Sequence, residues 1–234
     1  VKECLPMIDK DLAKRLRKKM EKDGIKFNMG YSVQSIADLK ADAVLVATGR
    51  KPNYDEEELT QVGIEFDRRG IITDDNMLTT ADGIYAIGDV NGKALLAHAA
   101  TFQGIRAVNH ILNRHDHIRF DIMPSAVFTQ PEVASVGITE DACKTNGIAY
   151  KTHKGFYRAN GKAMAEEATD GLAKIVTGDG GRIIGCHILG AHAADMVQEV
   201  AALMNKDVTL SELADMIHIH PTLSEIVQDI AING

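Results

Sequence analysis

Cysteine is scarce in this 234-residue chain, and the positions of the three cysteines exclude several kinds of site. Cys4, Cys143 and Cys186 lie far apart, so none has a neighbour at the spacing of a pair of zinc ligands. Their odd number also gives no basis for a framework of disulfides. We therefore expect reduced thiols, no metal site and a cytoplasmic location, in a bacterial or organellar interior.

The chain also lacks long apolar runs and an excess of positive charge. No apolar run approaches the roughly 20 residues that a membrane-spanning helix requires, and the first residues have no apolar segment typical of a signal peptide. Acidic side chains outnumber basic ones by 33 to 26, for a net charge of −7. A nucleic-acid partner needs a basic surface. We therefore expect neither a membrane nor a nucleic acid as partner.

The first 50 residues have the pattern of the middle of an α/β domain. Residues 9–24 predict a helix with Asp9 as its N-cap and Gly24 at its end. Its apolar positions recur at helical spacing, as Leu12, Leu16 and Met20. Residues 25–27 begin a strand, and the nearly all-apolar run 42–50 ("DAVLVATGR") is typical of a buried parallel strand. A helix that leads into a parallel strand predicts the end of a Rossmann-like sheet.

The middle of the chain predicts short elements and one long helix. Residues 56–62 predict a short helix, residues 70–90 short strands and turns, and residues 95–113 a long helix. The link at 113–119 ("NRHDHIR") is the predicted domain boundary. Its histidines and charges also suggest a metal site, although a solvated linker is the favoured interpretation.

Beyond residue 120 the pattern changes to strands and glycine turns followed by helices, which predicts an α+β domain. The strand-like segments are 125–129, 133–137, 173–178 and 182–189, and the last two flank "DGG" as in a hairpin. The predicted helices are 193–205, 210–216 and 222–230. The apolar face of 193–205 suits either a subunit interface or the core.

The string "TADGIYAIGD" (80–89) combines a predicted buried strand, Ile84 to Ile87, with a glycine and a carboxylate. Gly88 allows close approach of a ligand, and Asp89 follows the carboxyl end of the strand, where ligands bind in open α/β folds. A carboxylate there can accept a hydrogen bond from a sugar-like hydroxyl. Alternatively, Asp89 caps the helix that follows.

The string "HIHPTLSE" (218–225) also has two interpretations. Thr222 and Glu225 fit a capping box, in which Glu225 bonds to the Thr222 N–H and stabilises the helix by about 0.5–2 kcal/mol. In the other interpretation His220 is an acid–base group and Glu225 orients its ring. Both interpretations require the same carboxylate, and local pattern alone favours the cap. His218 is interpreted as supporting structure.

Four groups of residues, read in order, carry a resemblance to a known family. They are "VLVATGRKPN" (44–53), "TADGIYAIGDV" with "LLAHAATFQG" (80–90 and 95–104), "PSAVFTQPEVASVG" (124–137) and "HIHPTLSE". On these residues the chain resembles the flavoprotein pyridine nucleotide-disulfide oxidoreductases. "HPTLSE" and "TQPEVASVG" are most similar to the dihydrolipoyl dehydrogenase branch. With the resemblance, the acid–base interpretation of His220 and Glu225 is favoured.

The resemblance implies two cofactors, FAD and NAD. Asp89 would hold the ribityl chain of FAD, and the start of the long helix would line the flavin ring through Leu95, Leu96, Ala97 and His98. A helix N-terminus, with its free N–H groups, suits an electron-rich reduced flavin. His98 is interpreted as a packing or backbone-contact residue. Gly49 would lie against NAD, with Val33 as a second contact.

The chain departs from the family pattern in ways that limit the assignment. It has no pair of cysteines separated by four residues and no GxGxxG loop, and "TGDGGRIIG" is better interpreted as a turn. Between residues 36 and 41 it has a short link where the family has a hairpin. We therefore expect a C-terminal half without the N-terminal FAD domain. Its expected parts are the end of the NAD domain (1–52), a central domain contacting FAD (53–120) and an interface domain (121–234).

The function implied is NAD-dependent oxidation of dihydrolipoamide on a lipoyl-bearing protein of a 2-oxoacid dehydrogenase or glycine cleavage complex. His220 and Glu225 would serve the other subunit of a homodimer. One alternative is another flavin disulfide reductase, for example one acting on glutathione. The other is that the isolated chain is a non-catalytic dimerisation module.

Overall fold

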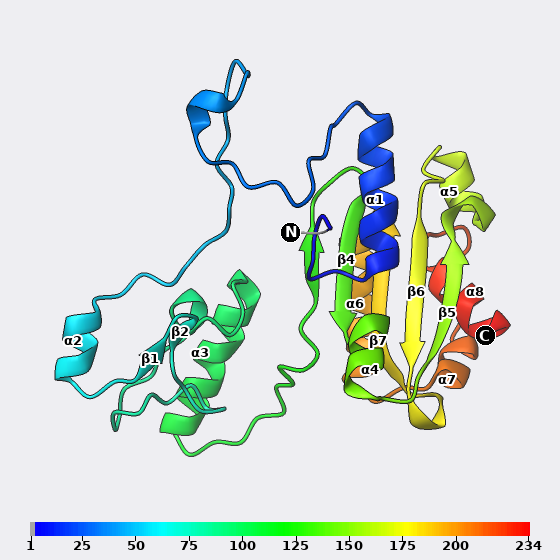
Figure 1. Cartoon of the computed structure of the whole chain (residues 1–234). Helices are drawn as coiled ribbons and strands as arrows, with labels where there is room; N and C mark the ends of the chain where they lie inside the picture. The colour runs from blue at the N-terminus through cyan, green and yellow to red at the C-terminus, as the bar shows by residue number, and fades with distance from the viewer. Residues whose placement is uncertain (1–2) are drawn as a thin grey trace. The chain divides into compact units, whose positions relative to one another are not determined.

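The computed structural model describes residues 3–234, with Asp38 described by its backbone alone. The described residues form two compact units (Figure 1). One unit, called here the sheet unit, contains the residues up to Val33 together with Asp121–Gly234. The other, the central unit, is Gln34–Phe120. None of the helices in the described part of the chain has the length and apolar character needed to cross a bilayer.

The sheet unit is built on five antiparallel strands in the order β3-β4-β7-β6-β5. The strands are β3 (Ser125–Val127), β4 (Glu132–Gly137), β5 (Lys151–Phe156), β6 (Leu172–Thr177) and β7 (Ile183–Gly190). β6 and β7 form the predicted hairpin around a turn at Asp179–Gly181, where Gly180 and Gly181 have positive φ. Every residue of β6 is buried, because helices cover both faces of the sheet.

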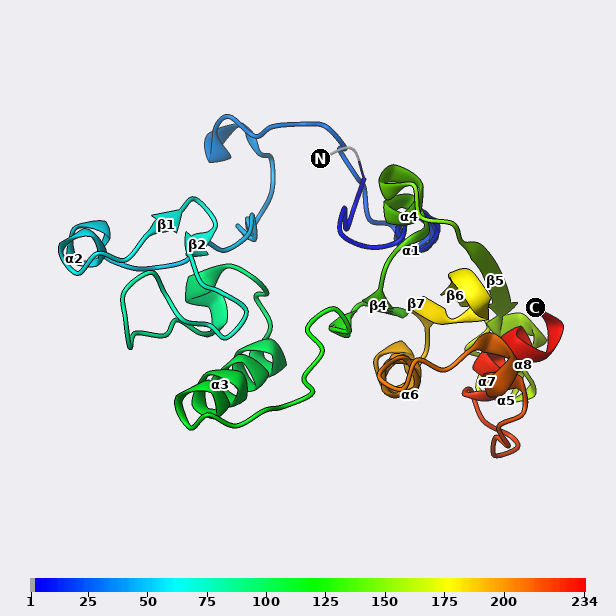
Figure 2. The same ribbon diagram turned by 90° about the horizontal axis from the view of Figure 1, so that it is seen from below.

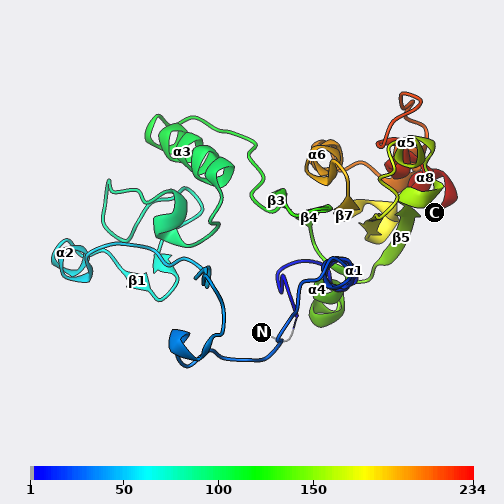
Figure 3. The same cartoon turned by 90° about the horizontal axis from the view of Figure 1, so that it is seen from above.

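One face of the sheet packs against α6 (Ala193–Met204), α7 (Leu210–Ala214) and α8 (Glu225–Asn233). α1 (Lys10–Lys22) and α4 (Glu140–Asn146) lie on the other face, as Figures 2 and 3 show. The alternation of side chains along each strand divides the core accordingly. Ala134, Ala173 and Ile188 face α6, whereas Val133, Leu172 and Leu189 face α1. The apolar face of α6 is therefore core.

Lys174 is the unusual member of the α1 face, since its side chain is only 1% exposed. Its Nζ lies 2.9 Å from Asp9 Oδ1, 2.8 Å from Asp11 Oδ2 and 3.1 Å from Glu140 Oε2. Burial by itself would lower the pKa of Lys174, but the hydrogen bonds to Asp11 and Asp9 raise it above its ordinary value. Hydrogen bonds from Lys144 and then Lys174 lower the pKa of Glu140 to about 2. One buried ammonium thus joins α1, β6 and α4.

α1 confirms the helix predicted at the start of the chain. The carboxylate of Asp9 accepts a hydrogen bond from the Asp11 N–H, as an N-cap does. Gly24, with a φ of 97°, follows the end of the helix. Asp9 therefore has two roles, because the same side chain caps α1 and pairs with Lys174.

The central unit contains small elements around a core of Ile64, Ile71 and Ala86. These elements are the 3₁₀ turn η1 (Ile36–Asp38), α2 (Glu56–Gln61), β1 (Phe66–Asp67), β2 (Gly70–Ile71), the 3₁₀ turn η2 (Gly88–Asn91) and the long helix α3 (Ala97–Ile111). The helices predicted at 56–62 and 95–113 are confirmed, with ends that differ by one or two residues.

Three predicted strands are not formed. Residues 25–27 and 42–50 pair with no described residue in a sheet, and Leu45 is 90% exposed. A β-strand forms by hydrogen bonding to a neighbouring strand, and these two segments have no such neighbour among the described residues. The third prediction, a buried strand from Ile84 to Ile87, is also wrong, because both of these side chains are exposed. Only an isolated bridge, between Leu78 and Tyr85, forms there.

We expect Lys174→Met to lower the free energy of unfolding of the sheet unit by about 3–5 kcal/mol, because it leaves the buried carboxylate of Asp9 without its cation. Urea denaturation followed by circular dichroism would measure the change. Lys10→Met is the matched control, since the Lys10–Asp141 ion pair is exposed and should contribute at most about 1 kcal/mol. Equal, small losses in the two variants would contradict a stabilising role for the buried pairing.

Candidate functional site

The closing loop, residues 215–224, joins α7 to α8 and presents His220 to solvent. The His220 side chain is 80% exposed, and its Nδ1 lies 2.9 Å from Glu225 Oε1. A carboxylate only accepts hydrogen bonds, so the proton of a neutral ring belongs on Nδ1. Nε2 then carries the lone pair and is available to take a proton from a ligand.

The second oxygen of Glu225 makes the capping contact. Glu225 Oε2 accepts a hydrogen bond of 2.8 Å from the Thr222 N–H. Both interpretations of this carboxylate are therefore realised together, one at each oxygen. The Thr222 N–H, first, and His220, second, lower the pKa of Glu225.

The other half of the predicted capping box is absent. The Thr222 hydroxyl donates backwards to the Ile219 carbonyl, and α8 begins at Glu225 with no side-chain cap. The prediction that this helix starts at Thr222 is therefore wrong, because the hydroxyl that would start it is engaged in the loop. A complete box exists one helix earlier, where Thr209 and Glu212 exchange both bonds at the start of α7.

Asn160 supports the loop from a distance in sequence. Its side chain is buried, and Nδ2 donates to the Thr222 carbonyl at 3.0 Å. Oδ1 accepts from the Ala163 N–H and caps α5 (Gly161–Ala165). Sequence reasoning did not identify Asn160. An Asn followed by Gly at a helix start indicates the cap, but nothing in the neighbouring sequence indicates the contact with the Thr222 carbonyl.

Asp89 lies in η2 rather than at the end of a strand. Its carboxylate is 3.7 Å from the Arg50 guanidinium, and both side chains are at least partly exposed. The alternative that Asp89 caps the next helix is not observed, because α3 begins eight residues later with Leu96 at the N-cap position.

The start of α3 has no side-chain cap, so the N–H groups of its first turn need other partners. The residues predicted to line a flavin all lie here. Leu95, Ala97 and His98 are exposed, and Leu96 is half-buried. The structure therefore brings Asp89 and the four helix-start residues into one unit of the chain. Their contact with a cofactor stays a prediction.

Gln103 and Asn91 hold the turn that carries Asp89, and sequence reasoning missed both. Gln103 Oε1 accepts from the Gly88 N–H at 2.6 Å and from Asn91 Nδ2 at 2.9 Å. Asn91 Nδ2 also donates to the Ala86 carbonyl. Both side chains are buried. The available signal was a polar residue, Gln103, on the face of the long helix that otherwise carries small apolar residues.

The two residues predicted to contact NAD lie in extended segments. Gly49 has a φ of 115°, which favours glycine, and Val33 is half-exposed. Neither residue lines the cavity at the end of α3 or the cavity beside the closing loop. Their role stays a prediction.

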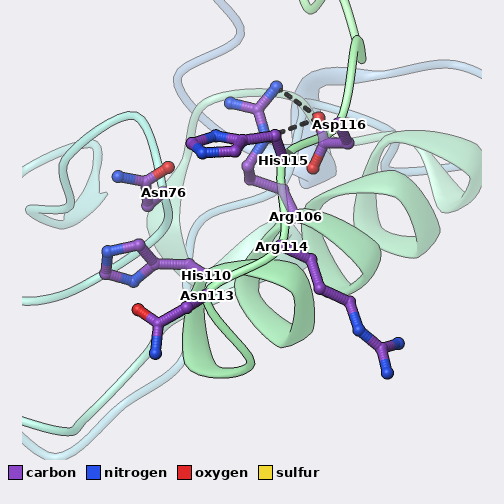
Figure 4. A pocket seen from close by; sticks show the side chains of 7 residues that line it. All are labelled: Asn76, Arg106, His110, Asn113, Arg114, His115 and Asp116. Carbon is purple, nitrogen blue, oxygen red and sulfur yellow. Dashed lines mark hydrogen bonds and ion pairs between the residues drawn. The ribbon is translucent and has the colours of Figure 1, made fainter.

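Two cavities accompany these sites. One, of about 300 Å³, lies in the sheet unit between the loop residues 221–224, α5 and the start of α6. The other, of about 420 Å³, is shown in Figure 4 at the end of α3. There Arg106 pairs with Asp116 at 2.9 Å, and the hydrogen bond from Arg106 lowers the pKa of Asp116 to about 2. The link at 113–119 therefore folds back on α3, and its solvation is only partial.

No three His, Cys, Asp or Glu side chains gather as metal ligands would in residues 3–234. The His-rich link does not form such a group.

Comparison with known proteins gives two family matches. Residues 1–104 match the model described as pyridine nucleotide-disulphide oxidoreductase, and residues 123–231 match the dimerisation domain of that family. Together the matches span nearly the whole chain.

Among curated relatives, dihydrolipoyl dehydrogenase of Synechocystis sp. is 43% identical over 202 residues, covering 82% of this chain and 43% of that protein. The Chlamydia muridarum enzyme of the same name is 37% identical, covering 98% and 53%. The chain thus spans about half the length of the curated relatives that it matches.

Among solved structures, LpdA from Mycobacterium tuberculosis superposes with a TM-score of 0.86 at 27% identity, covering 96% of this chain and 53% of that one. RclA from Escherichia coli, an HOCl-induced flavoprotein disulfide reductase, also gives 0.86, at 25% identity, with coverage of 97% and 56%. The similarity therefore extends over both units of the chain.

We expect His220→Ala to raise the pKa of Glu225 only part of the way to its ordinary value, because the bond from the Thr222 N–H remains. Carboxyl ¹³C shifts, followed by NMR as a function of pH, would report this. Glu212 is an internal control, since its pKa is lowered by the Thr209 main chain and side chain without a histidine. A complete return of the Glu225 pKa, with Glu212 unchanged, would contradict the capping contact.

Proposed function

The chain belongs to the pyridine nucleotide-disulphide oxidoreductase family, and on this premise we propose that it is the C-terminal half of a dihydrolipoyl dehydrogenase. Such an enzyme oxidises dihydrolipoamide to lipoamide with FAD and NAD⁺. Curated relatives of that name, at 31–43% identity, support the proposal. So does their length, since about half of each is matched by this chain.

The observation that carries the proposal is the His220–Glu225 pair. Oxidation of a dithiol removes two electrons and two protons, so a group is needed that accepts a thiol proton near neutral pH. The His220 side chain is exposed, and its Nε2 carries the lone pair once Glu225 holds the proton on Nδ1. Glu225 also stabilises the imidazolium that forms, and its second bond, to the main chain of Thr222, fixes the carboxylate.

The central unit fits a flavin in two respects. The uncapped start of α3 supplies main-chain N–H groups and the positive end of a helix dipole, which suit a reduced flavin. Asp89 supplies an accessible carboxylate that can accept a bond from a ribityl hydroxyl. When bound, FAD supplies the electron relay between a dithiol–disulfide system and NAD⁺. We assign Asp89 and the helix-start residues 95–98 to FAD.

We assign Gly49 to the nicotinamide cofactor, with Val33 as a weaker second contact. Gly49 lacks a Cβ and has a φ that other residues rarely adopt, so its main chain allows close approach. The apolar run before it would become a paired strand beside the preceding strands of a complete NAD domain.

We further propose a homodimer that acts on a lipoyl-bearing protein. The match of residues 123–231 to a dimerisation domain supports the homodimer. The closing loop also presents Ile217 and Ile219, both largely exposed, beside His220. Apolar side chains of that kind suit burial against a second subunit.

A second candidate is a flavin disulfide reductase with a different substrate. The structural similarity to RclA, an HOCl-induced flavoprotein disulfide reductase, supports this candidate. A glutathione-specific enzyme is a further variant. As an isolated chain, the protein would be a non-catalytic dimerisation module, because it contains no cysteine pair of the kind the reaction needs.

In the complete enzyme, we expect His220→Gln to lower lipoamide-dependent NADH formation by roughly 100- to 10,000-fold, because proton transfer loses its base. Flavin absorbance and the dimer should remain. His117→Gln is the control, since it changes an exposed histidine outside both cavities. Unchanged turnover in the His220 variant would remove His220 from the reaction. If the His220 variant loses turnover of glutathione disulfide but keeps turnover of lipoamide, the second candidate is favoured.

A further inference from the structure

His218 is the one side chain of residues 217–220 that turns into the protein. Ile217 is 99% exposed, and Ile219 and His220 also face outward, whereas the His218 side chain is only 7% exposed. The closing loop therefore projects from the sheet unit at these positions and is anchored through His218.

Both ring nitrogens of His218 face oxygen acceptors. Nε2 lies 2.8 Å from Glu199 Oε1, on α6, and Nδ1 lies 3.0 Å from the Met216 carbonyl. An ionised Glu199 can only accept a hydrogen bond, and the same holds for the Met216 carbonyl. A neutral imidazole has one N–H, so it would leave a lone pair directed at an oxygen. Only the doubly protonated ring satisfies both contacts.

We propose that His218 is an imidazolium bridging Glu199 and the Met216 carbonyl, and that this charged anchor positions His220. It is a positioning residue and does not touch the substrate. The proposal rests on the proposed function only for the chemical role of His220. The bridge itself is independent of that function.

The contacts around the loop connect the bridge to His220. The Met216 carbonyl also accepts a bond of 2.7 Å from Gln228 on α8, so the bridge joins α6, the loop and α8. Two residues beyond His220, Thr222 is held by Glu225 and Asn160. His220 therefore lies midway between two fixed points, at 218 and 222.

The charge of His218 also reaches the acid–base pair. After the hydrogen bonds from Thr222 and His220, the charges of His220 and His218 lower the pKa of Glu225 further. Loss of the bridge would therefore loosen the loop and remove one positive charge that favours the ionised Glu225. Both changes weaken the bond that keeps the proton of His220 on Nδ1.

The test is ¹H–¹⁵N NMR of the histidine rings in the 234-residue chain, labelled with ¹⁵N-histidine, at neutral pH. His220→Gln assigns the His220 signals. We expect two protonated nitrogens on His218 and a dominant Nδ1–H form of neutral His220. In Glu199→Leu, His218 should lose its double protonation. His220 should then lose its dominant Nδ1–H form and approach the mixture of a free imidazole.

Two further variants make the result specific. Glu199→Gln keeps the shape of the side chain, and its amide can donate to Nε2, so His218 should become neutral in a folded chain. Asp195→Asn is the matched control, because it removes the same charge from α6 one turn earlier at a side chain that is 88% exposed. It should leave both histidines unchanged.

A neutral His218 in the unmodified chain would overturn the proposal. So would an unchanged His220 signal in Glu199→Leu, or a doubly protonated His218 in Glu199→Gln. These outcomes are distinct from failure of the proposed function. If His220→Gln leaves lipoamide turnover unchanged in the complete enzyme, the function fails while the NMR result still stands or falls by itself.

Discussion

The closing loop depends on the way in which the carboxylate of Glu225 is shared between two donors. One oxygen accepts from the His220 ring and the other from the Thr222 N–H. The helix start and the acid–base pair would be alternatives if a carboxylate had a single acceptor site, but its two oxygens accept independently. The position of Glu225 in the first turn of α8 also suits its negative charge, because the helix dipole is positive there. The cap thus fixes the carboxylate that orients the histidine.

The sheet unit supports this loop from both sides of its core. α6 and α8, which carry Glu199 and Gln228, pack on one face of the sheet, and the Lys174 cluster holds α1 and α4 on the other. Burial of an ammonium is costly and is offset only when carboxylates surround it. Three carboxylates surround the ammonium of Lys174, which explains how a charged residue occupies the centre of a fully buried strand.

Local pattern predicted the elements whose signals lie within one segment. The Asp9 cap, the β6–β7 hairpin around "DGG" and α6 are of this kind. The strand at 42–50 was predicted wrongly because pairing depends on neighbours that the described chain does not provide.

Side-chain contacts between distant segments were not predictable from periodicity. A lysine in a strand usually indicates an exposed position. Lys174 is buried instead, and its partners come from α1 and α4. Glu199 and Asn160 likewise meet the closing loop only after folding. His220 and Glu225 were identified because the motif and the resemblance act together, whereas local pattern alone favoured a cap.

The most direct test of their proposed role uses mixed dimers of the complete enzyme, formed from a His220→Gln subunit and a subunit without its redox cysteines. We expect turnover, which is strongly reduced in the His220→Gln parent and absent in the parent without the cysteines, to return in the hybrids, because one site then has the base from one subunit and the thiols from the other. Hybrids that form and bind flavin but remain inactive would contradict it.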